Sequence, residues 1–91
     1  MGTKMSNSNI IARTVVGTAP NPKYVVSTVR LAGADRMPDI YGGRIFETMV
    51  FACDADGAVT DWLELDCQRY ETEDGARLGH AWHVQTWANR S

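Results

Sequence analysis

Arg44-Ile-Phe-Glu-Thr-Met-Val-Phe-Ala-Cys53 is the stretch that decides the fold. Apolar residues fall on both of its alternating sides, which is typical of a central strand covered on both faces. The turn signal Asp54-Ala-Asp-Gly57 follows, and residues 58–67 return as a second strand. The sequence therefore predicts a β-hairpin at the centre of the domain.

The register of this hairpin decides which side chains face the core. If Asp54 lies opposite Ala58, the resulting pairs are Met49 with Leu63, Glu47 with Leu65 and Ile45 with Cys67. The odd-numbered side chains then form the core face, which holds Ile45, Met49, Phe51, Cys53, Val59, Leu63, Leu65 and Cys67. We expect the buried core to contain Met49, Phe51, Leu63, Leu65, Val84 and Trp87.

Two further strands and one helix complete the prediction. Residues 9–16 and 23–31 are rich in β-branched residues and predict two strands before the hairpin. Thr72 has the residue type of a helix N-cap, and a helix over residues 73–88 places Ala76, His80, Val84 and Trp87 on one side. We therefore expect an α+β fold, in which one C-terminal helix packs on one face of an antiparallel sheet of three to four strands.

The chain is expected to form a single domain over residues 10–91. Residues 1–9 are polar and patternless, and we interpret them as a disordered N-terminus or a remnant of the expression vector. Residues 32–43 hold four Gly and Pro residues without a clean period and predict a long loop. Such a loop in a small domain is either functional or a slack connection between strands.

Composition excludes several classes of function. The chain has 91 residues, 44% of them hydrophobic, and a formal charge of −2, which lacks the basic surplus that drives nucleic-acid binding. No window reaches the length of apolar sequence that a membrane span needs, so we expect a cytoplasmic protein. In the predicted register Cys53 and Cys67 lie at opposite ends of the hairpin, which predicts two free thiols.

Three separated blocks resemble a family of small uncharacterised proteins encoded by actinobacterial phages. The blocks are Val26-Ser-Thr-Val29, Phe46-Glu-Thr-Met-Val-Phe51, and Arg69-Tyr70 followed by Thr72-Glu73, Ala76 and Gly79-His80. The resemblance covers residues 24–84, whereas residues 1–22 have no counterpart and the loop 32–43 departs from the family's shorter, proline-rich loop. It implies a phage origin and expression inside a bacterial host, and it brings no activity or catalytic residues.

Ser27, Glu47 and His80 form the first candidate site. Strand alternation puts Ser27 and Glu47 on the predicted core face, and the helix expected on that face carries His80 on its inner side. A Ser/His/Glu hydrolase is one interpretation, although Ser27 lacks a glycine-rich elbow and an oxyanion hole. The favoured interpretation is a buried pair in which His80 satisfies Glu47, and a ligand-binding polar pocket is the third.

Cys53, Cys67, His80 and His83 resemble a zinc-ligand set only in composition. Neither pair has the close cysteine spacing of zinc knuckles, and the predicted register separates the two thiols. We therefore expect ordinary thiols, with no metal and no cofactor.

The even-numbered face of the hairpin predicts an interface. Phe46, Val50 and Trp62, together with Tyr24 and Val26, would form an apolar patch on the side away from the helix. The segment 9–16 could partly cover this patch, and a second copy of the chain or a host partner could also do so; we predict a homo-oligomer. Trp82 points away from the main helix stripe and is the expected exposed anchor. The candidate binding residues are Asp39, Tyr41, Glu47, Arg69, Tyr70, His80 and Trp82.

The sequence therefore favours a non-enzymatic phage accessory protein that acts by binding inside its bacterial host. The partner is either a host protein or a small ligand, and the chain is expected to act as a homo-oligomer. The alternatives are a small hydrolase that uses Ser27, His80 and Glu47, and a minor virion component.

Overall fold

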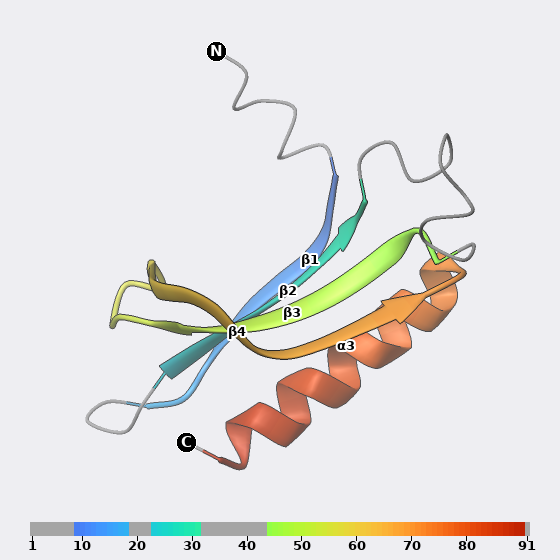
Figure 1. Ribbon diagram of the computed structural model, residues 1–91. Coiled ribbons are helices and arrows are strands. Elements are labelled where there is room, and N and C mark those ends of the chain that lie inside the picture. Colours follow the sequence, from blue (N-terminus) through green and yellow to red (C-terminus); the bar gives the residue numbers. More distant parts are fainter. Residues whose placement is uncertain (1–8, 19–22, 32–43, 91) are drawn as a thin grey trace.

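The computed structural model describes residues 9–18, 23–31 and 44–90, and these form a sheet and a C-terminal helix (Figure 1). The strands are β1 (Ile10–Val16), β2 (Lys23–Arg30), β3 (Phe46–Cys53) and β4 (Val59–Tyr70), and the helix is α3 (Glu73–Ala88). The expected α+β fold is confirmed. The predictions for residues 1–8 and for the loop 32–43, including Asp39 and Tyr41, lie outside the described residues.

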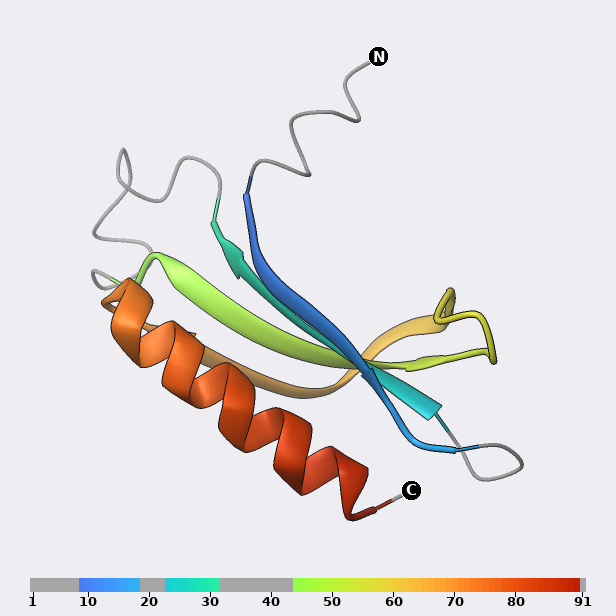
Figure 2. The same ribbon diagram turned by 180° about the vertical axis from the view of Figure 1, so that it is seen from behind.

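The strands pair in the order β1-β2-β3-β4, and each neighbour is antiparallel. Consecutive strands are therefore adjacent in space, which is the simplest antiparallel arrangement. Figures 1 and 2 show that α3 lies along one face of the twisted sheet. Within the described part of the chain, β1 and β4 are the edge strands.

The helix covers the even-numbered face of the sheet and not the odd-numbered face as predicted. Of the six residues expected in the core, Phe51 and Trp87 are buried, Met49 and Val84 are partly buried, and Leu63 and Leu65 are exposed. Val16, Val26, Val50 and Trp87 form one buried cluster, against which Tyr24 and Val84 pack. Phe46 and Val50 lie on this same face and are buried, so they cannot form the predicted oligomer interface. Apart from Trp62, which is exposed, the predicted apolar patch is covered by α3 itself.

A bulge in β4 displaces two of the residues that were expected in the core. Near the turn, Cys53 pairs with Val59 as the sequence predicted, but Met49 pairs with Cys67 and not with Leu63. Four residues of β4, Trp62 to Leu65, stand where β3 has only Phe51. A second irregularity at Thr60 adds one more residue, so the register shifts by four in total and the later residues of β4 keep their predicted faces. Leu63 and Leu65 lie inside the bulge and not opposite Met49 and Glu47, and both are exposed.

The odd-numbered face holds a smaller cluster beneath the hairpin tip. Val25, Phe51 and Cys53 are buried there, with Met49 and Val59 packed against them. The tip is held towards β1 and β2, because Arg13 Nη2 donates to the Gly57 carbonyl at 2.7 Å and Lys23 Nζ donates to the Ala55 carbonyl at 3.2 Å. Gly57 has φ of +84°, and a Cβ there would lie only 2.9 Å from Val15 Cγ2. The turn therefore needs glycine for both its conformation and its close approach to β1.

The helix begins and ends where the sequence predicted. The Thr72 hydroxyl accepts a hydrogen bond from Gly75 N at 3.0 Å, and Glu73 and Asp74 add negative charge to the first turn. Ala76, His80, His83 and Trp87 form its buried side. None of the helical residues that the structure describes forms a segment long and apolar enough to cross a membrane.

Candidate binding surfaces

Glu47 and His80 do not form the predicted pair, because they lie on opposite faces of the sheet. Glu47 is only 4% exposed, but its partners are on β4: Arg69 Nε donates to Glu47 Oε2 at 2.8 Å. The Cys67 thiol donates to the same oxygen at 3.5 Å. Burial, aided by the Glu47 carboxylate, raises the pKa of Cys67 to about 11. Glu47 is thus a buried carboxylate on the odd-numbered face that is held by two exposed side chains of β4.

His80 lies beneath α3 between two threonines of the even-numbered face. Its Nε2 is 2.9 Å from Thr14 Oγ1, and its Nδ1 is 2.7 Å from Thr28 Oγ1. Burial lowers the pKa of His80 below its ordinary value of 6.5, and the charge of His83 contributes in the same direction. The ring is therefore neutral at pH 7 and can accept one hydrogen bond while it donates the other.

The two His80 contacts belong to a longer hydrogen-bonded chain. Thr28 Oγ1 lies 2.6 Å from Thr48 Oγ1, and Thr48 bonds the Tyr70 hydroxyl, which in turn donates to Gln68 Oε1 at 3.4 Å. This series of hydrogen bonds connects side chains of all four strands with the helix. Among the described residues, no buried side-chain nitrogen or oxygen lacks a hydrogen-bond partner. This arrangement favours a structural role, because each buried polar group is already satisfied.

The Ser27, Glu47 and His80 site of a hydrolase is not assembled. Ser27 and Glu47 are on the odd-numbered face, while both His80 nitrogens face threonines on the even-numbered face. The candidate zinc set is divided in the same way, since Cys53 and Cys67 lie on the odd-numbered face and His83 is buried beneath α3. Both cysteines are free, as predicted.

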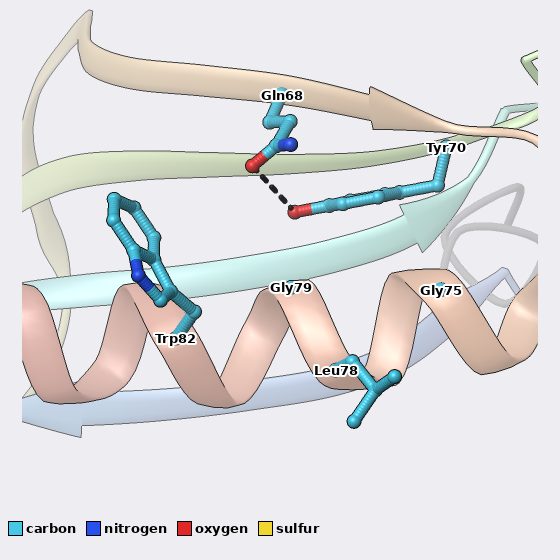
Figure 3. Close-up of a pocket in the computed structure, with 6 residues that line it drawn as sticks. All are labelled: Gln68, Tyr70, Gly75, Leu78, Gly79 and Trp82. Atoms are coloured by element: carbon cyan, nitrogen blue, oxygen red, sulfur yellow. Dashed lines mark hydrogen bonds between the residues drawn. The ribbon is translucent and has the colours of Figure 1, made fainter.

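A groove of about 510 Å³ runs between α3 and the edge strand β4 (Figure 3). It is lined by Gln68, Tyr70, Gly75, Leu78, Gly79 and Trp82. The Tyr70 ring lies against Gly79 so closely that a Cβ at residue 79 would overlap it. Gly79 therefore permits the close approach between helix and strand that shapes the groove.

The outward side of α3 carries two large apolar side chains beside this groove. Leu78 is 75% exposed and Trp82 is 60% exposed, and they lie one helical turn apart. The Trp82 ring packs edge-on against His83, with centroids 4.9 Å apart. Figure 3 shows Leu78 projecting away from β4 while Trp82 stands beside the groove. The predicted exposure of Trp82 is confirmed.

The bulge of β4 makes a second exposed apolar surface. Trp62 is 74% exposed, Leu63 69% and Leu65 44%. The Trp62 ring meets the Phe51 ring edge-on with centroids 5.2 Å apart, which places Trp62 on the odd-numbered face. We call Trp62, Leu63 and Leu65 the bulge patch. Acidic residues interrupt it and flank it, namely Asp61, Glu64 and Asp66.

The structure divides the predicted binding residues among three places. Tyr70 and Trp82 line the groove, Arg69 and Glu47 pair on the other face, and His80 is buried in the hydrogen-bonded chain. Sequence reasoning missed Leu78, although its spacing of four residues from Trp82 is a signal for a shared helix face. It also missed the bulge patch, because the predicted register assigned Leu63 and Leu65 to the core.

Comparison with models of known protein families, with curated proteins and with solved structures found no match for this chain. The function must therefore be argued from the surfaces themselves.

Proposed function

We propose that this chain is a non-enzymatic phage accessory protein that acts inside its bacterial host by binding a host protein through the bulge patch. The single observation that carries the proposal is the exposure of Trp62, Leu63 and Leu65 next to one another on an edge strand. Bulges redirect side chains and interrupt strand pairing, and they are treated as built features of a fold. Exposed large apolar side chains gathered in one segment are typical of an interaction site.

The charges around the bulge patch indicate the chemistry of the partner. Asp61 and Glu64 are exposed among the apolar residues, and Asp61 Oδ1 accepts a hydrogen bond from Leu63 N at 3.0 Å. The complementary surface is an apolar recess with lysines or arginines at its rim. Catalysis has no comparable support, since the Ser27 and His80 side chains are on opposite faces.

Replacing Trp62 with Ala should abolish the binding of the host partner. The experiment is affinity capture from host lysate with three immobilised baits, which are the wild type, Trp62→Ala and Trp82→Ala. Trp82→Ala is the matched control, because it removes an equally exposed tryptophan from a different surface. The partner should be retained by the wild type and Trp82→Ala and lost from Trp62→Ala. With the purified partner, calorimetry should then give a dissociation constant at least about 30-fold weaker for Trp62→Ala.

Salt provides a second check on the same complex. The partner's basic rim predicts weaker binding as the NaCl concentration rises, because exposed charge pairs are screened. The proposal is wrong if Trp62→Ala retains the same host proteins as the wild type, or if the purified partner binds both with equal affinity.

A further inference from the structure

Helix α3 is apolar on two opposite sides, which a surface helix of a single domain does not require. Its inner side is formed by Ala76, His80, His83 and Trp87 against the sheet. Its outer side carries Leu78 and Trp82, which the described residues leave largely exposed. A helix that packs on one layer normally presents polar residues to water on the other side. The outer side of α3 therefore has the character of a second packing surface.

We infer that two copies of this chain form a symmetric dimer through the outer sides of their α3 helices, with the Leu78 and Trp82 side chains of each copy packed against the groove of the other. Figures 1 and 2 show that α3 lies on the outside of the molecule, where a second helix can approach it. The inference concerns a different surface from the bulge patch and does not rest on the proposed host binding.

The residues on the outer side of α3 are complementary to themselves. In a two-fold interface the same patch meets itself, so it must supply both the projecting side chain and the surface that receives it. Leu78 and Trp82 are four residues apart, and an antiparallel pairing centred between them sets Leu78 of one copy against Trp82 of the other. Each Trp82 also reaches the groove that Tyr70 and Gln68 line on the opposite copy.

The charges along the helix favour the antiparallel arrangement. The start of α3 is acidic, with Glu71, Glu73 and Asp74, of which Glu73 is paired with Arg77 at 2.9 Å. The end of α3 carries Arg90, whose guanidinium lies 4.5 Å from the Trp87 ring centroid. An antiparallel pair centred at residue 80 brings the segment after α3 of one copy, which carries Arg90, beside the segment before α3 of the other, which carries Glu71. The helix dipoles then also oppose one another favourably.

A second copy explains the patch better than pairing of β4 edges. The bulged edge of β4 carries the exposed Asp61 and Glu64, so two such edges would bring like charges together. The Cys67 amide, which points to that edge, already donates to Asp66 Oδ1 at 2.9 Å. Bulges and edge carboxylates are features that oppose edge-to-edge pairing. The outer side of α3 has neither a bulge nor edge carboxylates.

The test is the molar mass of the purified protein by light scattering over a dilution series. An interface formed by one helix per copy is small, so we expect a dissociation constant on the order of 10 µM. The wild type should therefore have twice the monomer mass at high concentration and fall towards the monomer mass on dilution. Trp82→Ala should weaken the dimer at least about 30-fold, whereas Trp62→Ala should leave the dissociation constant unchanged.

A charge exchange tests the antiparallel geometry independently. Glu71→Lys and Arg90→Glu should each weaken the dimer about tenfold, and the double variant should recover most of the loss because the pair is restored with reversed signs. Circular dichroism checks that each variant is folded. These substitutions are at exposed residues, so they test the interface and not the core.

Each outcome decides the inference. A wild type that remains a monomer at about 1 mM, well above the expected dissociation constant, overturns it. A dimer that Trp62→Ala disrupts and Trp82→Ala preserves also overturns it, because the interface would then be the bulge patch. Failure of the double charge variant to recover would reject the antiparallel pairing. A monomeric protein that still binds a host protein through Trp62 would leave the proposed function standing.

Discussion

Replacing Trp87 with Ala should lower the free energy of unfolding by about 3 to 5 kcal/mol, the typical cost of emptying a large aromatic site in a core. Trp87 is buried with Val16, Val26 and Val50, and its ring packs edge-on against Tyr24 with centroids 4.9 Å apart. The substitution also removes the hydrogen bond from Trp87 Nε1 to Asp66 Oδ2, which is 3.1 Å long. A small domain has a total stability of about 5 to 15 kcal/mol, so this variant will be close to unfolding.

Urea titration should compare the free energy of unfolding of Trp87→Ala with that of Trp82→Ala. Trp82 is largely exposed, so its replacement should change the stability of the monomer by no more than about 0.5 kcal/mol. The titrations should be run at low micromolar protein, because dimerisation would add a concentration-dependent term to the apparent stability. Equal losses for the two tryptophans would contradict the assignment of the inner and outer sides of α3.

Replacing Thr28 with Val should cost about 1 to 3 kcal/mol although the side chains have nearly the same shape. Thr28 has no exposed surface, and its hydroxyl bonds both His80 Nδ1 and Thr48 Oγ1. Valine would leave the buried His80 Nδ1 without its hydrogen-bond partner. The loss of stability is then the cost of burying that nitrogen with no hydrogen bond to offset it.

The exposed Thr60 of β4 provides the control for that substitution. Thr60→Val keeps the change from hydroxyl to methyl but removes no buried hydrogen bond, so its effect should stay within about 0.5 kcal/mol. Thermal or urea unfolding that gave Thr28→Val and Thr60→Val the same stability would show that the buried chain of hydrogen bonds contributes nothing.

The elements of this fold could be predicted from local signals. The N-cap Thr72 with Glu73 and Asp74 defined the start of the helix, and the turn Asp54 to Gly57 defined the hairpin tip. The β-branched runs before the hairpin defined β1 and β2. These features depend on a few consecutive residues, so they do not require knowledge of the tertiary structure.

The face that the helix covers could not be predicted in the same way. Val25 and Val26 in β2, like Val50 and Phe51 in β3, give each strand an apolar residue on both sides. The alternation of β2 and β3 therefore favours neither face, and the prediction relied on Leu63 and Leu65, which the bulge displaces from their expected partners. No glycine or proline stands within the bulge to mark it. An unmarked bulge thus removed the two leucines that favoured the odd-numbered face as the core.

Part of the prediction of the candidate sites was wrong for the same reason. The predicted contact of Glu47 with His80 required the helix to cover the odd-numbered face, and α3 covers the even-numbered face instead. The exposure of Trp82 could be predicted because it follows from the period of the helix alone. The interaction of Glu47 with Arg69 could not, because it depends on the pairing of β3 with the shifted part of β4.

The position of the Trp87 indole relative to the two faces of the sheet tests the central claim most directly, because both proposed surfaces depend on which face α3 covers. Nuclear Overhauser effects from the Trp87 ring protons should reach the methyl groups of Val26 and Val50, which share its buried cluster. Effects from Trp87 to Val25 and Met49 in their place would put the helix on the odd-numbered face and contradict this account.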